Sequence, residues 1–141
     1  MKNVLVLCTG NSCRSQMAHG YLKALQPHPL AEIYSAGIET HGLNQDAVRI
    51  MQEDSVDIAS HTSNHVSEYA GIAWDYIITV CDHAHENCPF IPAPNAKRIH
   101  QNFSDPSKVD GTEQERHIAF LETRNAIKEF CRNFIQAELL P

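Results

Sequence analysis

The segment that most constrains this chain is the polar run from Cys8 to Ser15, which separates two apolar segments of different periodicity. Residues 4–7 before it are all Val or Leu, which is typical of a buried parallel strand. The apolar residues after it recur at helical spacing: Met17, Ala18, Tyr21, Leu22 and Leu25. The sequence therefore predicts a strand, a loop and a helix in direct succession.

This loop has the parts of a site for a tetrahedral oxyanion. Backbone N–H groups at a helix start converge on an anion, Gly10 allows the chain to approach it closely, and Arg14 offers a planar fork to two of its oxygens. The same positive field is expected to lower the pKa of Cys8 and make its thiolate a nucleophile, with Ser15 as a further hydrogen-bond donor. The expected oxyanion-binding residues are Thr9, Gly10, Asn11, Ser12, Cys13, Arg14 and Ser15.

The alternative is a small buried cysteine that happens to lie near a surface arginine. A Cys and an Arg separated by five residues are weak evidence alone. Their position between a strand and a helix, with Gly, Asn and Ser in the loop, favours the functional interpretation.

Composition limits the class of protein. A chain of 141 residues suits one domain, residues 1–141, and its net charge of −6 argues against nucleic-acid binding. No stretch resembles a signal peptide or a membrane span, so a cytoplasmic protein with no membrane association is expected. Five cysteines are an odd number, which argues against a static disulfide framework. Because the net charge is negative, any anion site must be built from local groups, Arg14 and backbone dipoles, rather than from the overall charge.

The remaining chain alternates strands and helices, which predicts an α/β fold: a single domain with a four-stranded parallel sheet and helices on both faces. Helix starts are indicated by Asn44 as an N-cap and by a capping box of Thr112 and Glu115. A polar loop is expected at 56–65 and a long irregular loop at 81–95. Further strands are expected at 31–36, 75–80 and 96–100, and a short helix at 66–70.

Two distant cysteines are expected to meet at one edge of the sheet. Cys8 and Cys81 each follow a predicted strand directly, and ligands of parallel sheets bind beyond the carboxyl ends of the strands.

The segment from Cys81 to Cys88 admits three interpretations. It can be a zinc site using Cys81, His83, His85 and Cys88, although the spacing matches no common zinc pattern. It can also be a polar loop with two incidental thiols. The third interpretation is a redox pair, in which one cysteine attacks a bond to Cys8 and the two then exchange. The loop must be flexible or rearrange for their sulfurs to meet.

Asp105, followed by Pro106, is expected on a loop after the fourth strand. Its carboxyl group can act as a general acid for a departing oxygen. Asp before Pro is equally common in turns, so the residues alone leave both roles open.

The string Cys-Thr-Gly-Asn-Ser-Cys-Arg-Ser-Gln-Met-Ala from Cys8 onward resembles the low-molecular-weight protein tyrosine phosphatase superfamily, and within it the thioredoxin-coupled arsenate reductases. That branch carries a Cys, six residues and Cys-Pro after the third strand, as Cys81 and Cys88 do here. The resemblance covers nearly the whole chain and implies the same fold.

The resemblance also implies a reaction. Arsenate, with phosphate or sulfate as mimics, binds in the loop at Arg14; Cys8 attacks arsenic and Asp105 is the general acid. Cys81 and Cys88 then form the redox pair that thioredoxin reduces. No bound cofactor is implied. The competing function is that of a phosphatase, which needs neither Cys81 nor Cys88.

Two departures from the family pattern stand out. Ser107 and Lys108 follow the Asp-Pro pair where phosphatases often carry tyrosines, so an aromatic peptide substrate receives less support. Some reductases of the family bind potassium near the loop, and here Asn11, Ser35 and Thr62 match that site, but His19 and Asn64 stand where carboxylates are expected. We therefore expect no metal site.

Overall fold

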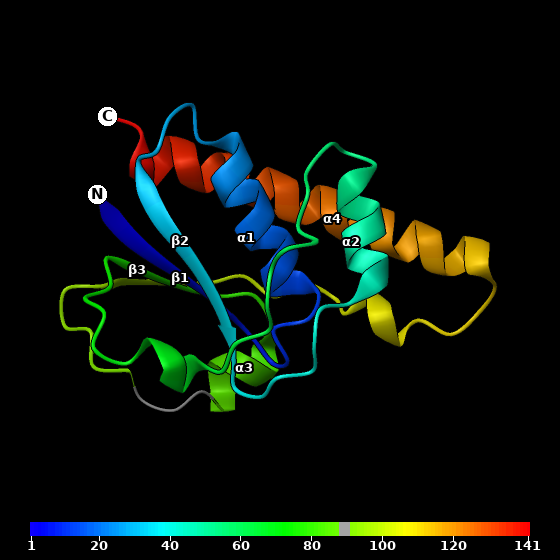
Figure 1. Ribbon diagram of the computed structural model, residues 1–141, viewed down its shortest axis with the longest axis horizontal. Helices are drawn as coiled ribbons and strands as arrows, with labels where there is room; N and C mark the ends of the chain where they lie inside the picture. Colours follow the sequence, from blue (N-terminus) through cyan, green and yellow to red (C-terminus); the bar gives the residue numbers. More distant parts are fainter. Residues whose placement is uncertain (88–90) are drawn as a thin grey trace.

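A parallel sheet with the strand order β2-β1-β3-β4 forms the centre of the protein (Figure 1). The computed structural model describes residues 1–87 and 91–141. The strands are β1 Lys2–Cys8, β2 Ala31–Gly37, β3 Tyr76–Thr79 and β4 Lys97–His100, close to the four predicted segments. Because all four run in one direction, their carboxyl ends share one edge.

The long helices lie together on one side of the sheet. Figure 1 shows α1 (Arg14–Leu25), α2 (Gln45–Gln52) and α4 (Glu113–Phe134) there, with α1 against α4. The predicted caps are confirmed: Asn44 accepts from the Ala47 N–H at 3.0 Å, and Thr112 and Glu115 form the capping box. The other helical segments are η1 Val66–Tyr69 and η2 Pro106–Lys108, both 3-10, α3 Asp82–Asn87, and the π-helical η3 Ile135–Leu139.

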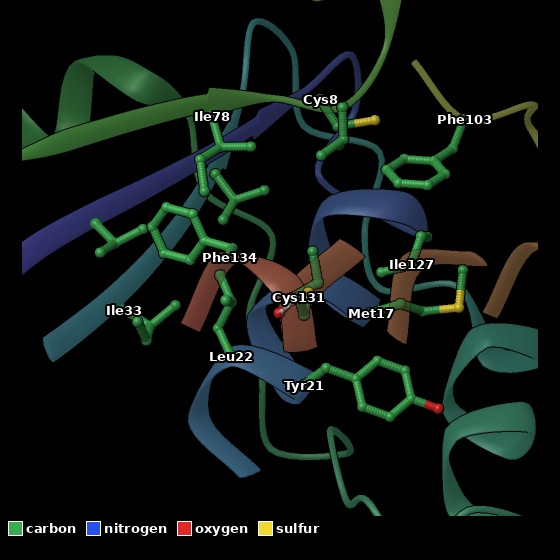
Figure 2. Packing of buried hydrophobic residues seen from close by; sticks show 14 of the residues in the cluster. Cys8, Met17, Tyr21, Leu22, Ile33, Ile78, Phe103, Ile127, Cys131 and Phe134 are labelled. Atoms are coloured by element: carbon green, nitrogen blue, oxygen red, sulfur yellow. Dashed lines mark hydrogen bonds between the residues drawn. The ribbon is translucent and has the colours of Figure 1, made fainter. Parts of the chain in front are cut away.

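Strand alternation divides the apolar residues between two clusters. Val4 and Val6 of β1 belong to the larger cluster, which includes the apolar stripes of α1 and α4 (Figure 2). Cys131 lies fully buried in it, on the predicted apolar stripe of α4. Leu5 and Leu7 point to the opposite face.

The opposite face of the sheet carries no long helix in the described residues. Leu5, Leu7 and Ile77 pack there with Trp74, and Tyr34 meets Trp74 edge-on at 5.2 Å between ring centroids. The covering elements are η1 and irregular connections. The predicted fold class, a four-stranded parallel sheet with helices, is confirmed, and the helix on the second face is the short 3-10 helix η1.

One prediction was wrong: residues 81–95 do not form a continuous irregular loop, because residues 82–87 are the helix α3. Only Ala84 of α3 is buried, so the helix leaves no apolar periodicity in the sequence. Its first turn is instead held by polar contacts, among them a hydrogen bond from the Ala84 N–H to the Cys81 sulfur at 3.4 Å.

Within residues 1–87 and 91–141, the structure contains no helix with the length and apolarity needed to cross a membrane.

A polar network ties α1 and α4 to the segment after α2. The Tyr21 hydroxyl donates to Asp54 at 2.7 Å, and Lys128 donates to the same carboxylate oxygen at 2.8 Å. These hydrogen bonds, that from Lys128 first, hold the pKa of Asp54 below its usual range. Ionised Asp54 therefore stabilises the packing of three segments.

We expect Asp54→Asn to lower the free energy of unfolding at pH 7 by roughly 1 kcal/mol. A carboxylate with a lowered folded-state pKa stabilises the fold above its unfolded pKa, and that contribution disappears as the pH falls through the folded value. The difference between the two proteins in urea unfolding should therefore shrink below about pH 4. The exposed Asp110→Asn is the control, and a pH-independent difference would contradict the assignment.

Candidate functional site

The loop from Thr9 to Cys13 is shaped by hydrogen bonds to its outward-facing carbonyl groups. The segment that follows β2 runs beside the loop and donates a succession of backbone N–H groups to it. These bonds are Ile38 to Cys8 at 3.4 Å, and Glu39 to Thr9, His41 to Gly10 and Asn44 to Ser12, each at 2.9 Å. Because these carbonyl groups are bound on the outside of the loop, the N–H groups of the same peptide units face inward.

The inward-facing N–H groups are the main candidates for binding an anion at the loop. Within the described residues, none of the N–H groups of residues 10–13 donates to another protein atom. Together with the start of α1 directly after the loop, these groups form a concave positive surface. This is the predicted oxyanion-binding geometry.

Asn11 holds the loop from behind. Its backbone is left-handed, with φ of 48°, and its side chain donates to the Ser15 hydroxyl at 2.8 Å and accepts from the Asn64 N–H at 2.8 Å. Gln16, fully buried, donates to the Asn11 carbonyl at 3.0 Å. The structure thus places Ser15 against Asn11 rather than against the Cys8 sulfur, so the expected bond from Ser15 to the thiolate is absent from the described contacts.

Gly10 is required by a side chain that the sequence analysis missed. The imidazole ring of His41 occupies the space where a Cβ atom at position 10 would lie. His41 Nε2 is 2.6 Å from Glu39, which fixes the ring over the loop. Sequence spacing gave no signal for this contact, because it depends on how the segment after β2 returns to the loop.

Arg14 is positioned by the segment that carries the candidate general acid. Its guanidinium donates to the Phe103 carbonyl at 2.9 Å and lies 3.5 Å from Asp105. The Arg14 Nε atom is buried and has no partner among the described residues. Asp105 also caps η2, accepting from the Ser107 N–H at 3.0 Å. The turn role is therefore present, and the carboxyl group is held beside the loop at the same time.

Cys81 lies at the same edge as Cys8, as predicted from the strands. Its sulfur is 3.2 Å from the Thr9 hydroxyl oxygen and accepts the Ala84 N–H. A hydrogen bond from the Cys8 thiol, followed by those from Thr9 and Ala84, lowers the pKa of Cys81 to about 5. Cys81 is thus the sulfur on which negative charge is stabilised.

The structure differs from the sequence expectation for Cys8. Its hydrogen bond to Cys81 and its burial raise the pKa of Cys8, and they outweigh the opposing effects of Arg14 and the Thr9 N–H. The two thiols form one unit that holds a proton between two sulfurs and loses its first proton easily. The two shifts have opposite directions, so the same contacts that raise the pKa of Cys8 lower that of Cys81.

The site opens into a cavity of about 410 Å³. Its walls include Cys8, Arg14, Cys81 and Asp105, so four of the five predicted catalytic residues meet there; the fifth, Cys88, lies outside the described residues. Thr9, Gly10, Ser12 and Cys13 also line it, whereas Asn11 and Ser15 stand behind the loop. Burial, and secondarily Asp105, raises the pKa of Cys13 to about 12, which favours packing over reaction.

The zinc alternative gains no support from the described residues. Among them, no three Cys, His, Asp or Glu side chains gather in a way that could hold a metal ion. His85 points to Thr79 and His100 instead.

The residues at the family's potassium position do not fit a cation. His19 is hydrogen-bonded to Ser35 at 2.8 Å and stacked on His61, and burial lowers the pKa of His19 to about 3. Thr62 donates to Asn64 at 2.8 Å. A neutral imidazole and an amide thus replace the two carboxylates that a hard cation would need there.

The fold and the site define a class: an α/β protein in which a cysteine and an arginine on one strand-to-helix loop face a cavity for an oxyanion. The family model described as low molecular weight phosphotyrosine protein phosphatase matches residues 3–139. The chain belongs to this family.

Proteins similar to this chain carry names that are more specific than the description of the family. The chain is 44% identical over 137 residues, 96% of each chain, to a protein of Bacillus licheniformis named arsenate reductase. Among solved structures, it resembles an arsenate reductase in the oxidized state, with a TM-score of 0.82 at 26% identity over 96% of this chain and 98% of that one. It also resembles an arsenate reductase in the phosphate binding state, with a TM-score of 0.74 at 26% identity over 99% and 100%.

We expect Asn11→Ala to destabilise the protein by roughly 2–4 kcal/mol, since it removes one buried and one partly buried hydrogen bond and replaces Asn, which tolerates the left-handed backbone conformation, with Ala, which does so less well. Asn11→Gly removes the same hydrogen bonds but accepts the backbone conformation, so it should be about 1 kcal/mol less destabilising. Urea unfolding measures both values. Equal losses would show that backbone strain at this position is unimportant.

Proposed function

We propose that this protein reduces arsenate to arsenite by a three-cysteine relay of Cys8, Cys81 and Cys88, and that thioredoxin regenerates it in the cytoplasm. The relatives' names and the family support this function. The observation that carries it is that Cys8 and Cys81 line one cavity, with the Cys81 sulfur 3.2 Å from the hydroxyl oxygen of Thr9, the residue after Cys8. A phosphatase needs only one of these two sulfurs, whereas a disulfide requires both within reach.

In the first step, arsenate occupies the loop, bound by the N–H groups of residues 10–13 and by Arg14. The Cys81 thiolate takes the proton of Cys8, which leaves Cys8 as a thiolate inside the positive loop. Cys8 attacks arsenic, and Asp105 protonates the departing oxygen, which leaves as water. Arg14 has its Nε atom free among the described contacts, so the guanidinium can bind the oxyanion while it holds Phe103.

In the second step, the Asp105 carboxylate left by the first step takes the proton of Cys81, and the Cys81 thiolate attacks the Cys8 sulfur. The Cys8–Cys81 bond forms and the bond from sulfur to arsenic breaks. The electron pair of the broken bond stays on arsenic, which is reduced from arsenic(V) to arsenic(III) and leaves as arsenite. The two thiols supply both electrons, so no bound cofactor is required.

In the third step, Cys88 attacks Cys81 and frees Cys8, and thioredoxin reduces the resulting Cys81–Cys88 disulfide. The six residues of α3 lie between these cysteines in the sequence. As a helix they advance roughly 9 Å, more than the Cα separation of a disulfide permits. We infer that α3 unwinds in this step, which its single buried residue, Ala84, favours.

Hydrolysis of phosphate esters is the second candidate, because the family model is that of a phosphatase. Cys8, Arg14 and Asp105 are the groups such a reaction needs, and they line one cavity. We expect it as a side activity. The deciding experiment is production of arsenite from arsenate with thioredoxin, thioredoxin reductase and NADPH; no arsenite above a Cys8→Ser control would reject the proposed function.

Asp105→Asn should lower the rate of phosphate-ester cleavage by roughly a hundredfold or more, because the amide cannot donate a proton. The loss should be smallest for esters whose leaving groups need no protonation. A series of aryl phosphates of graded leaving-group acidity measures this dependence. An equal loss across the series would assign Asp105 only the turn role at η2.

The order of sulfur attacks predicts different end states for three variants. Cys8→Ser should abolish both activities, since a serine hydroxyl stays protonated in the loop. Cys81→Ser should stop at the arsenic adduct. Cys88→Ser should release one equivalent of arsenite and stop with Cys8 joined to Cys81. Single-turnover arsenite release, followed by mass mapping of disulfides after trapping of free thiols, separates these states.

Phosphatase activity is the internal control for these variants. It should largely survive in Cys81→Ser and Cys88→Ser, because neither change removes Cys8, Arg14 or Asp105. Repeated thioredoxin-dependent turnover by Cys88→Ser would show that the relay does not operate as proposed.

A further inference from the structure

A second polar cluster of Thr79, Asp82, His85 and His100 lies where the ends of β3 and β4 meet α3, and of these four residues Asp82 alone lines the cavity that holds Cys81. The rings of His85 and His100 are stacked, with centroids 4.1 Å apart and planes 22° apart. The Thr79 hydroxyl is 2.7 Å from His100 Nδ1 and 3.4 Å from His85 Nδ1. His100 Nε2 lies 2.7 Å from the Asp82 carboxylate. Thr79 at the end of β3 and His100 at the end of β4 thus contact two side chains of α3, those of Asp82 and His85.

One placement of hydrogens accounts for all three contacts of this cluster. The Asp82 carboxylate only accepts, so His100 Nε2 carries a hydrogen and donates to it. The Thr79 hydroxyl donates one hydrogen and accepts another, so it can join the two Nδ1 atoms as a bridge. The three contacts therefore support one arrangement of these four side chains.

This network is the main attachment of α3. The helix has six residues and buries only Ala84, so apolar packing contributes little to it. The backbone of Asp82 adds one more polar contact, from its N–H to Asn102 at 2.9 Å. Without the histidine stack, the second half of α3 has no comparable contact with the sheet among the described residues.

The position of α3 matters because its first turn touches the Cys81 sulfur. The Ala84 N–H donates to that sulfur at 3.4 Å, and a donor to a thiolate stabilises the charged form. If α3 frays, the Ala84 N–H donates to water instead of to the Cys81 sulfur. Other titratable or charged side chains share the cavity with this sulfur from several elements: Cys8 at the end of β1, Cys13 and His41 on the neighbouring loops, Arg14 at the start of α1, Asp82 and His83 on α3, and Asp105 and Lys108 around η2.

We propose that His85 and His100, joined by Thr79, are positioning residues that hold α3 in place and thereby keep the Ala84 N–H on the Cys81 thiolate. Their role is to supply the attacking form of Cys81 at low and neutral pH. The proposal deepens the proposed function, on which it rests only in taking Cys81 as an attacking sulfur; the state of Cys81 is measurable without arsenate.

The test is the pH dependence of Cys81 alkylation by iodoacetamide, read from the Cys81 peptide by mass spectrometry. Loss of one hydrogen bond to the thiolate should raise the apparent pKa of Cys81 by about one unit in His85→Ala. With a parent value of about 5, the alkylation rate at pH 5 should fall about fivefold and stay within about twofold at pH 8.

Two further variants make the result specific. His83→Ala removes an exposed imidazole of the same helix that lines the Cys81 cavity and lies 3.4 Å from the Asn87 side chain, but is not part of the stack. If the stack is what positions α3, the Cys81 thiol of this variant should titrate as it does in the parent. Thr79→Val keeps the side-chain volume and removes the bridge, so it should shift Cys81 in the same direction as His85→Ala. Far-UV circular dichroism and the unchanged alkylation at pH 8 show that the variants are folded.

An unshifted Cys81 titration in His85→Ala or in Thr79→Val would overturn the proposal, and so would an equal shift in His83→Ala. Under the proposed function, single-turnover arsenite release by His85→Ala should be slowed at pH 5 and not at pH 8. A shifted titration without any arsenite release in the parent protein would keep the positioning role and reject the reductase, so the two failures are distinguishable.

Discussion

The outward hydrogen bonding of the loop carbonyls is the interaction on which the rest of this structure depends. A peptide group whose oxygen is held on one side must present its N–H on the other. The segment after β2 fixes the oxygens of Cys8, Thr9, Gly10 and Ser12 in this way, while Gln16 fixes that of Asn11. The parallel pairing of β1 with β2 brings the two segments side by side. An anion site thus arises in a chain whose net charge is negative, because oriented dipoles and one arginine act locally.

In the proposed reaction, a second thiol adds redox chemistry to that site. One sulfur alone in the positive loop would be the ionised nucleophile that sequence reasoning expected. With Cys81 in contact, the charge moves to the sulfur that also has the Thr9 hydroxyl and the Ala84 N–H as donors, and the proton stays on Cys8. In the proposed reaction, transfer of that proton makes Cys8 the first nucleophile. When Cys81 becomes a thiolate again, it acts as the second nucleophile.

The fold and the polar loop were predictable because they depend on local sequence. All-apolar residues 4–7, the cap at Asn44 and the capping box at Thr112 each fix an element within a few residues, and parallel strands then bring Cys8 and Cys81 to one edge. The helix α3 was not predictable, because polar contacts with His100 and Asn102 hold it rather than an apolar stripe. His41 over Gly10 was missed for the same reason: both contacts join residues far apart in sequence.

In the proposed reaction, the loop binds the anion and Cys81 reduces it, and this separation bears on how arsenate and phosphate are distinguished. The two ions have nearly the same shape and charge, so N–H groups and a guanidinium cannot separate them well. Phosphorus(V) bound to Cys8 is not reduced by thiols, and its only way out is hydrolysis. Arsenic(V) on the same sulfur can accept an electron pair when Cys81 attacks. Selectivity for arsenate in the proposed reaction therefore lies in the second sulfur, and α3, whose Ala84 N–H donates to Cys81, contributes to it from outside the loop that binds the anion.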